Sequence, residues 1–464
     1  MKLLRVAYRN ICRNKRRSLM TVLAIAVSTV SVLLFGGNIM SIIYTLQTGY
    51  VRGTGHVHIY KTGYSKFGSV NPAAYGITDY ERVLSVVQED PEVKPRLRSA
   101  MPFMFLQGIA GNFKAEASQG FIGLGIVPSA FEVFTKWDQY GLKVTKTETL
   151  IEMGDKDAAQ GVIGSGMAEK MKLCAELKID GCLVDPAAAK KDVAPSGKAE
   201  DFSALTAEDF PAEAAAAPGA PTLDLLAATA GGAPNVVSMT VRKAMPFGTK
   251  AQNESLILMH LNLAQQLICG RGANSVTGIM LQLNRTDDMD AVVKRLRQVL
   301  PASEYEVKPF TEVRPMYKQT ISMFATIFGF VALIMGVIVL FTTINTMSMS
   351  VMERVSEIGT ARALGLRRSA IMMQFVAEGF LLGVIGATLG TVVALGTSAF
   401  INWAELVWIP PDYATPVLLS VHLFLSPYFL PGCWLGLVAV TTLSSVLPAR
   451  NAARMPIVDA LRHI

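Results

Sequence analysis

Four long apolar stretches constrain the fold of this chain more than any other feature. Each has about 20 or more mostly apolar residues, the length that a helix needs to cross the hydrocarbon of a bilayer. They predict transmembrane helices at residues 19–44, 321–351, 371–401 and 428–448. Pro431 interrupts the fourth stretch, so its neighbours are expected to satisfy the backbone groups that the proline frees.

The composition agrees with a membrane protein that also has a large soluble part. The chain of 464 residues is 51% hydrophobic and 17% charged, whereas a soluble protein carries about a quarter charged residues. The net charge of +7 lies mostly beside the apolar stretches. A nucleic-acid-binding protein would concentrate that charge on one folded domain with a supporting motif. We therefore expect no nucleic-acid partner.

Lysine and arginine mark the two sides of the membrane. Seven basic residues precede the first span, four arginines separate the second and third spans, and three follow the fourth. The segment 402–427 has none. Because basic residues favour the cytoplasmic side, we expect the cytoplasm to hold residues 1–18, 352–370 and the tail 449–464. Residues 45–320 and the short loop 402–427 are then extracytoplasmic.

The segment before the first span has the pattern of an amphipathic helix. An apolar face carries Leu3, Leu4, Ala7, Tyr8 and Ile11, and basic residues occupy the other face. Such a helix lies among lipid headgroups, which makes membrane lipid an expected partner. A simple charge cluster that sets topology is an alternative, and the two interpretations are compatible. The first span is too long for a cleaved signal peptide, so we interpret it as an uncleaved anchor.

The large segment between the first two spans alternates strand and helix patterns, which favours an α+β domain. Strands are predicted at 53–63, 236–244, 275–283 and 305–310, and helices at 77–90, 254–269 and 286–300. Within this domain, residues 186–234 are rich in Ala, Pro and Gly. Because they offer few large apolar groups to bury, we expect a flexible insert there.

Cysteine and histidine indicate little chemistry. A Cys174–Cys182 disulfide fits an oxidising compartment, but the third extracytoplasmic cysteine, Cys269, shows that a disulfide framework is not obligatory. His56 and His58 stand two apart on a predicted strand. Without further ligands nearby they are interpreted as ordinary strand histidines, and no metal site is expected.

Enzyme motifs are absent from the sequence. It contains no G-x-x-x-x-G-K-[ST], no G-x-S-x-G and no H-E-x-x-H. We therefore expect no catalytic residue and no ATPase site in this chain. Within the spans, Glu378 is the exceptional ionisable residue. A carboxylate there is a functional candidate by default, but its place near the cytoplasmic end favours a structural bond to a neighbouring helix.

A charged segment, "ERVSEIGTARALGLRRSAI" at residues 353–371, joins the second and third spans. The pattern predicts a helix over residues 352–363, broken by Gly365. Such a helix can dock on a cytoplasmic protein and pass its movement to both spans. A solvated loop whose arginines only set topology is the alternative that the residues leave open.

The third span also carries glycines three and four residues apart. This spacing lets helix backbones approach closely. The glycines concerned are Gly379, Gly383, Gly386 and Gly390.

The stretch from "NTMSMSVMERVSEIG" to "GATLGTVVAL" resembles the signature region of the FtsX-like/MacB-type permeases of ABC transporters. The beginning, "AYRNICRNKRRSLMTVLAIAVS", and the end, "PARNAARMPIVDALR", resemble the same family. "TGHVHIYKTGY" and "SVTGIMLQL" are similar to its lipoprotein-releasing, LolC/LolE-type branch.

The resemblance implies that residues 353–371 contain the coupling helix, which binds a separate ATPase subunit. The residues implied to contact that subunit are Glu353, Arg354, Glu357, Ile358, Gly359 and Arg362, and Gly365 lies in the turn behind them. ATP and Mg²⁺ would be bound by that partner, and this chain would hold no cofactor. The implied location is the bacterial inner membrane, with the large domain in the periplasm.

Three functions follow from the resemblance. The first is release of lipoproteins from the inner membrane to a periplasmic carrier, driven by mechanical transmission of ATP-dependent motion. The second is MacB-type efflux through a tripartite pump with an adaptor protein. The third is FtsX-like regulation of cell-wall hydrolases. All three imply a dimer with a second copy or a paralogous permease.

Overall fold

The computed structural model describes residues 2–13, 15–68, 74–142, 151, 153–179, 220–229, 231–270, 274–414 and 416–456. The chain divides into two compact units. We call Met1–Thr45, Lys318–Leu406 and Leu418–Ile464 the membrane unit, and Leu46–Tyr317 with Val407–Val417 the outer unit.

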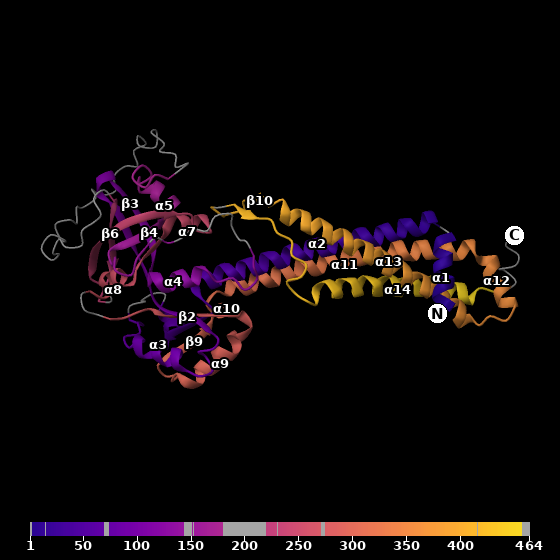
Figure 1. The fold of residues 1–464 in the computed structure, drawn as a ribbon, viewed down its shortest axis with the longest axis horizontal. Coiled ribbons are helices and arrows are strands. Elements are labelled where there is room, and N and C mark those ends of the chain that lie inside the picture. The colour runs from indigo at the N-terminus through magenta and orange to yellow at the C-terminus, as the bar shows by residue number, and fades with distance from the viewer. Residues whose placement is uncertain are drawn as a thin grey trace. The chain divides into compact units, whose positions relative to one another are not determined.

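In the part of the chain that the structure describes, the membrane unit consists of long helices and two short ones (Figure 1). The long helices are α2 (Lys15–Thr54), α11 (Pro315–Glu353), α13 (Arg368–Trp403) and α14 (Phe429–Arg454), each long and apolar enough to cross a membrane. The short helices are α1 (Lys2–Arg13) and α12 (Val355–Ala363). The predicted fold class, four transmembrane helices with a large α+β domain between the first two, is confirmed.

Helices α2 and α11 extend beyond the predicted spans at 19–44 and 321–351. Helix α11 has 39 residues and is therefore about 58 Å long at 1.5 Å per residue, nearly twice the hydrocarbon thickness.

Pro431 does not interrupt α14, because the helix begins at Phe429 and the proline falls in its first turn. A proline is tolerated there, since its missing N–H would have no intrahelical partner in any case.

Six strands of the outer unit pair in a closed ring. Their order is β3-β7-β4-β6-β5-β2, and a further β2–β3 pairing closes it. The strands are β2 (Leu97–Asn112), β3 (Ala117–Ile126), β4 (Gln160–Gly164), β5 (Thr222–Ala228), β6 (Pro234–Met245) and β7 (Leu256–His260). Each ring strand therefore has a hydrogen-bonded neighbour on both sides over part of its length.

Strand β2 also belongs to a second, antiparallel arrangement, β2-β8-β1-β9, with β1 (Val57–Lys61), β8 (Gly278–Leu283) and β9 (Tyr305–Pro309). Its first half pairs with β8 and its second half with β3. The outer unit also contains α3 (Tyr80–Glu89), α4 (Pro128–Thr135), α5 (Ser165–Lys170), α7 (Lys250–Ser255), α8 (Leu261–Cys269), α9 (Met289–Val299) and α10 (Phe310–Val313).

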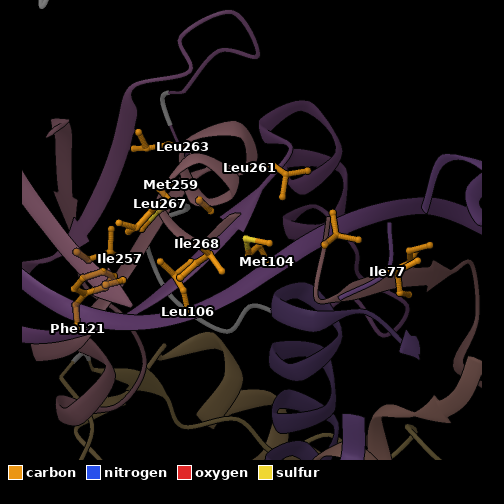
Figure 2. Packing of buried hydrophobic residues seen from close by; sticks show 14 of the residues in the cluster. Ile77, Met104, Leu106, Phe121, Ile257, Met259, Leu261, Leu263, Leu267 and Ile268 are labelled. Carbon is orange, nitrogen blue, oxygen red and sulfur yellow. The ribbon is translucent and has the colours of Figure 1, made fainter. Parts of the chain in front are cut away.

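One apolar cluster extends from the ring into the second sheet. Figure 2 shows part of it, with Leu106 of β2, Phe121 of β3 and Met259 of β7 close to Leu267 of α8. All four side chains are buried. Since burial of a large apolar side chain stabilises a fold by about 1.5–3 kcal/mol, this cluster holds α8 against the ring strands.

The predicted flexible insert at 186–234 is wrong at its carboxyl end. Residues 222–228 form β5, which pairs with β6 and β2. Leu223, Leu225 and Ala227 alternate with more exposed residues and are buried. This period of two is the pattern of a half-buried strand, and the Ala- and Pro-rich run before it masked the pattern. Residues 186–219 lie outside the described residues.

The predicted helix at 254–269 is also wrong in its first half. Residues 256–259 belong to β7, which pairs with β3 on one side and β4 on the other. A short continuous apolar run is compatible with a buried strand or a buried helix, and these two pairings decide between them. Helix α8 begins only at Leu261, after the His260 side chain accepts a hydrogen bond from the Asn262 N–H.

The segment between the third and fourth long helices contributes to the outer unit. Val407–Val417 lies within it, and Tyr413 forms a β-bridge with Thr249. The Lys250 N–H donates to the Asp412 carbonyl, and the Ala414 N–H donates to the Gly248 carbonyl. The outer unit is therefore assembled from two separate stretches of sequence.

Candidate functional site

Helix α12 is the centre of the charged segment, and local backbone geometry defines both of its ends. Arg354 leaves the helical conformation between α11 and α12. At the other end Gly365 has a φ of +93°, its N–H donates to the Arg362 carbonyl, and the Leu366 N–H donates to the Ala361 carbonyl. This pair of bonds is the Schellman motif, which needs a left-handed residue and favours glycine.

Arg354 is bonded inside the chain. Its guanidinium donates to the Glu378 carboxylate of α13 at 2.9 Å and lies over the Phe375 ring, 5.2 Å from its centroid. Asn10 of α1 donates to the same Glu378 oxygen at 2.6 Å. Arg354 is 7% exposed and Glu378 is 4% exposed. Glu378 thus joins α1, α13 and the start of α12, in line with the structural interpretation of this carboxylate.

Two more ion pairs connect the amino-terminal helices to this segment. Arg13 pairs with Glu357 at 2.8 Å, and Arg17 pairs with Glu353. The hydrogen bond and charge of Arg13 keep the pKa of Glu357 below its usual value. Sequence reasoning missed these pairs, although a signal was present. Two arginines four residues apart match two glutamates four residues apart, a spacing that favours the same face of a continuous helix, although each pair is divided between two helices here.

Only part of the predicted ATPase-contact set is available at the surface. Arg354, Ile358 and Gly359 are buried, and their predicted role as contact residues stays a prediction. Ile358 packs into the apolar cluster of the membrane unit, and Arg354 is held by Glu378. Arg362 is half-buried and donates to the Met455 carbonyl beyond α14. Glu353 and Glu357 are exposed.

Exposed apolar residues flank these glutamates. Leu364 is 84% exposed, Met352 is 60% exposed and Leu366 is 45% exposed. Single exposed apolar residues are ordinary, but these three belong to one short segment whose other side is fixed to the bundle. Sequence reasoning missed them because apolar residues next to a membrane span look like part of it.

The four glycines of α13 contact two different helices. A Cβ at Gly379 would meet Ser445 of α14 at 2.5 Å, and one at Gly383 would collide with Thr441 of the same helix. A Cβ at Gly386 would lie 2.7 Å from Ile25 of α2, and one at Gly390 would lie 2.6 Å from the Ala26 carbonyl oxygen. These glycines therefore allow close backbone packing.

The extracytoplasmic histidines are bonded within the fold. The His56 Nδ1 accepts from the Leu283 N–H at 3.0 Å, and the His58 Nδ1 lies 3.2 Å from the Tyr60 hydroxyl. Burial lowers the pKa of both to about 3. The described residues contain no group of three or more His, Cys, Asp or Glu side chains that could hold a metal ion.

Cys174 takes part in a disulfide. Its predicted partner, Cys182, lies outside the described residues, so the pairing stays a prediction. Cys12, Cys269 and Cys433 are free thiols.

Residues 326–457, which include most of α11 and all of α12, α13 and α14, match the model of the FtsX-like permease C-terminal family. This part of the chain is an FtsX-like permease domain. Helix α12, with the buried Arg354 before it and the exposed Leu364 and Leu366 after it, therefore lies inside the permease domain.

Similar proteins include two named macrolide export ATP-binding/permease protein MacB. The protein of Chlorobium luteolum is 26% identical over 237 residues, covering 48% of this chain and 32% of its own length. That of Escherichia coli is 29% identical over 222 residues, 46% of this chain and 31% of its own length. The uncharacterized ABC transporter permease YknZ of Bacillus subtilis is 26% identical over 197 residues, 41% and 46% of the two chains.

The chain thus spans about a third of the length of the MacB relatives that it matches. Two solved structures are also similar. The extracellular domain of YknZ has a TM-score of 0.29 with 14% identity, covering 54% of this chain and 98% of that domain. The periplasmic region of MacB from Actinobacillus actinomycetemcomitans has a TM-score of 0.31 with 11% identity, covering 58% and 95%.

Proposed function

We propose that this chain is the permease subunit of an ABC transporter of the FtsX/MacB type, and that α12 is its coupling helix. The observation that supports this most is the two-sided nature of α12. One side is fixed to α1 through Arg13, to α13 through Glu378 and to the end of α14 through Met455. The other side exposes Leu364 to solvent.

A separate ATP-binding subunit is the partner that we propose for the exposed side. Its contact residues would be Glu353, Leu364 and Leu366, with Glu357 and Arg362 at the edge, where their bonds fix the helix to the bundle. Clustered exposed apolar side chains with polar residues around them mark sites of protein interaction. In this proposal the partner binds ATP and Mg²⁺, and Arg354, Ile358 and Gly359 keep α12 attached to the bundle.

Helix α11 supplies a physical route for the motion. It ends at Glu353, directly before α12, and begins at Pro315, within the sequence of the outer unit. An unbroken helix of about 58 Å can transmit a push or a rotation along its axis. We propose that ATP-driven closure of two coupled subunits reaches the outer unit along α11, in a homodimer or a dimer with a paralogue.

For the cargo we propose lipoproteins, which would be released from the inner membrane to a periplasmic carrier. This rests on the sequence likeness of residues 54–64 and 275–283 to the lipoprotein-releasing branch, and the strands in these segments, β1 and β8, pair directly. A second candidate is efflux through a pump with an adaptor protein. It is favoured by relatives that are named macrolide export proteins. Both candidates place the termini in the cytoplasm and the outer unit in the periplasm.

The decisive experiment is purification of the tagged chain from its native membranes, followed by mass spectrometry of the retained proteins. We expect an ATPase with a Walker motif and acylated lipoproteins. Retention of an adaptor protein without lipoproteins would support efflux instead. Leu364→Asp is expected to abolish ATPase retention by placing a charge in the interface, and Leu364→Met is the matched control. If Leu364→Asp retains the ATPase as well as Leu364→Met does, the proposed coupling surface is wrong.

A further inference from the structure

Helix α1 has two faces with different roles. Ala7 is fully buried, Asn10 and Ile11 are half-buried, and Asn10 is the residue that bonds Glu378. At 100° per residue these three lie on one side of the helix. The apolar side predicted for contact with lipid is thus partly used for packing within the protein, and Tyr8 is instead 59% exposed.

The opposite face is strongly basic, and its cations have no acidic partner within the described part of the chain. Arg5 and Arg9 lie four residues apart on this face, and Lys15 and Arg16 follow where α2 begins. All four are exposed, and none forms an ion pair with any described residue. The nearby glutamates do not neutralise them, because Glu357 is paired with Arg13 and Glu353 with Arg17.

The position of these four basic residues beside the first long helix indicates what they bind. Only one residue separates α1 from α2, and the apolar part of α2 begins within about one turn of Arg16. A bilayer around α2 therefore places its headgroup layer beside these cations. Exposed Tyr8 adds an aromatic ring with a polar tip, which suits the same layer. Charge complementarity and this placement favour an anionic phospholipid over a soluble partner.

We propose that Arg5, Arg9, Lys15 and Arg16 form a binding surface for anionic phospholipid headgroups, and that lipid bound there fixes the position of α12. The link between them is short. Helix α1 holds Glu357 of α12 through Arg13, and through Asn10 it holds Glu378, the partner of Arg354. Only the consequence for transport depends on the proposed function, because lipid binding and its effect on α12 can be measured without any ATPase.

The test uses the full chain with phosphatidylglycerol as the probe. Phosphatidylglycerol is titrated into the protein in a nonionic detergent, and lipid-bound species are followed by native mass spectrometry. A basic residue near an anionic surface contributes about 1 kcal/mol, or about fivefold in affinity. Arg5→Gln/Arg9→Gln is therefore expected to weaken binding by about thirtyfold at low salt, whereas Arg5→Lys/Arg9→Lys retains it. The matched control is Arg450→Gln/Arg454→Gln, two exposed arginines in the last turns of α14.

Hydrogen exchange of the α12 amides tests the second half of the proposal. Phosphatidylglycerol is expected to slow exchange at residues 355–363 in the wild type and in the α14 control, but not in Arg5→Gln/Arg9→Gln. Equal loss of lipid binding in both double variants would show general charge attraction and overturn the site. Unchanged protection of α12 in Arg5→Gln/Arg9→Gln would overturn the link. Phosphatidylcholine, which has no net charge, is the lipid control.

Discussion

Arg354 and Glu378 form an ion pair in the structure, although nothing in the sequence connects them. In the sequence Arg354 belongs to a charged docking segment and Glu378 is an isolated carboxylate in an apolar span. In the structure they are partners at 2.9 Å and both are buried. Burying a charge costs free energy unless the charge is paired, so each residue offsets the desolvation cost of the other. Sequence spacing did not reveal the pair, because the turn at Gly365 between α12 and α13 brings it together.

Removal of one partner should therefore destabilise the membrane unit. Glu378→Gln leaves the buried Arg354 with only the half-exposed Glu357 carboxylate as a partner, and breaking a buried pair costs up to about 3–5 kcal/mol. Thermal unfolding in detergent should show a clear loss of stability. Glu353→Gln is the control, because the ion pair of Glu353 with Arg17 is half-exposed and such pairs contribute about 1 kcal/mol or less.

The double variant Arg354→Gln/Glu378→Gln makes this test specific. It removes both charges and should recover part of the stability that Glu378→Gln loses, because the two residues are coupled. Equal losses from Glu378→Gln and Glu353→Gln would contradict an essential role for the buried pair.

At the scale of elements, α13 packs through glycines on two neighbours in turn. Gly379 and Gly383 face α14, and Gly386 and Gly390 face α2. The spacing of the glycines predicted close packing but could not name the partners, because each face of a span looks equally apolar in the sequence. The same limit applies to the outer unit, where the apolar run at 256–259 predicts a helix and pairing with β3 and β4 makes it strand β7.

Gly390→Ala should weaken this packing. The new Cβ would lie 2.6 Å from both the Ala26 carbonyl oxygen and the Thr29 Cβ of α2. Because a backbone atom cannot yield as a flexible side chain can, we expect a loss of about 1–3 kcal/mol in thermal unfolding. Gly396→Ala on the same helix is the matched control, since a Cβ there meets nothing within 4 Å. Alanine is the better helix former, so the control should be neutral or stabilising.

At the scale of the whole molecule, the outer unit should be sensitive to acid. Burial lowers the pKa of His56 and of His58 to about 3, whereas unfolded histidine titrates near 6.5. Between these values the unfolded state binds protons that the folded state does not. Above about pH 6.5 both states hold the neutral histidine, and the free energy of unfolding of the outer unit has its full value. As the pH falls from there toward 3, this free energy decreases by up to about 1.4 kcal/mol per pH unit for each histidine.

Hydrogen exchange of β1 and β8 between pH 7.5 and 4, corrected for intrinsic rates, measures this loss in the full chain. His58→Phe keeps an aromatic ring beside Tyr60 and Phe103 but cannot titrate. It should show a shallower dependence on pH than the wild type. An equally steep dependence in both proteins would mean that other groups govern the acid response.

Local patterns predicted much of this fold and less of the site. Hydropathy located four spans, and period-two alternation located strands such as β6 and β9, because both signals are carried by neighbouring residues. The closure of the ring by β2 and β3, the inner pairing of Arg354 and the exposure of Leu364 were not predicted. Each depends on residues distant in sequence, and the chain pattern near each position allows more than one outcome.

The Val407–Val417 segment has a consequence for how such proteins can be recombined. The outer unit is assembled from two pieces of sequence, since Tyr413 bridges Thr249 and Asp412 accepts from Lys250. A chimera that exchanges only residues 46–317 with a relative would bring a foreign strand edge to this bridge. A chimera that exchanges the whole outer unit must therefore exchange two separate segments, residues 46–317 and residues 407–417, at the same time.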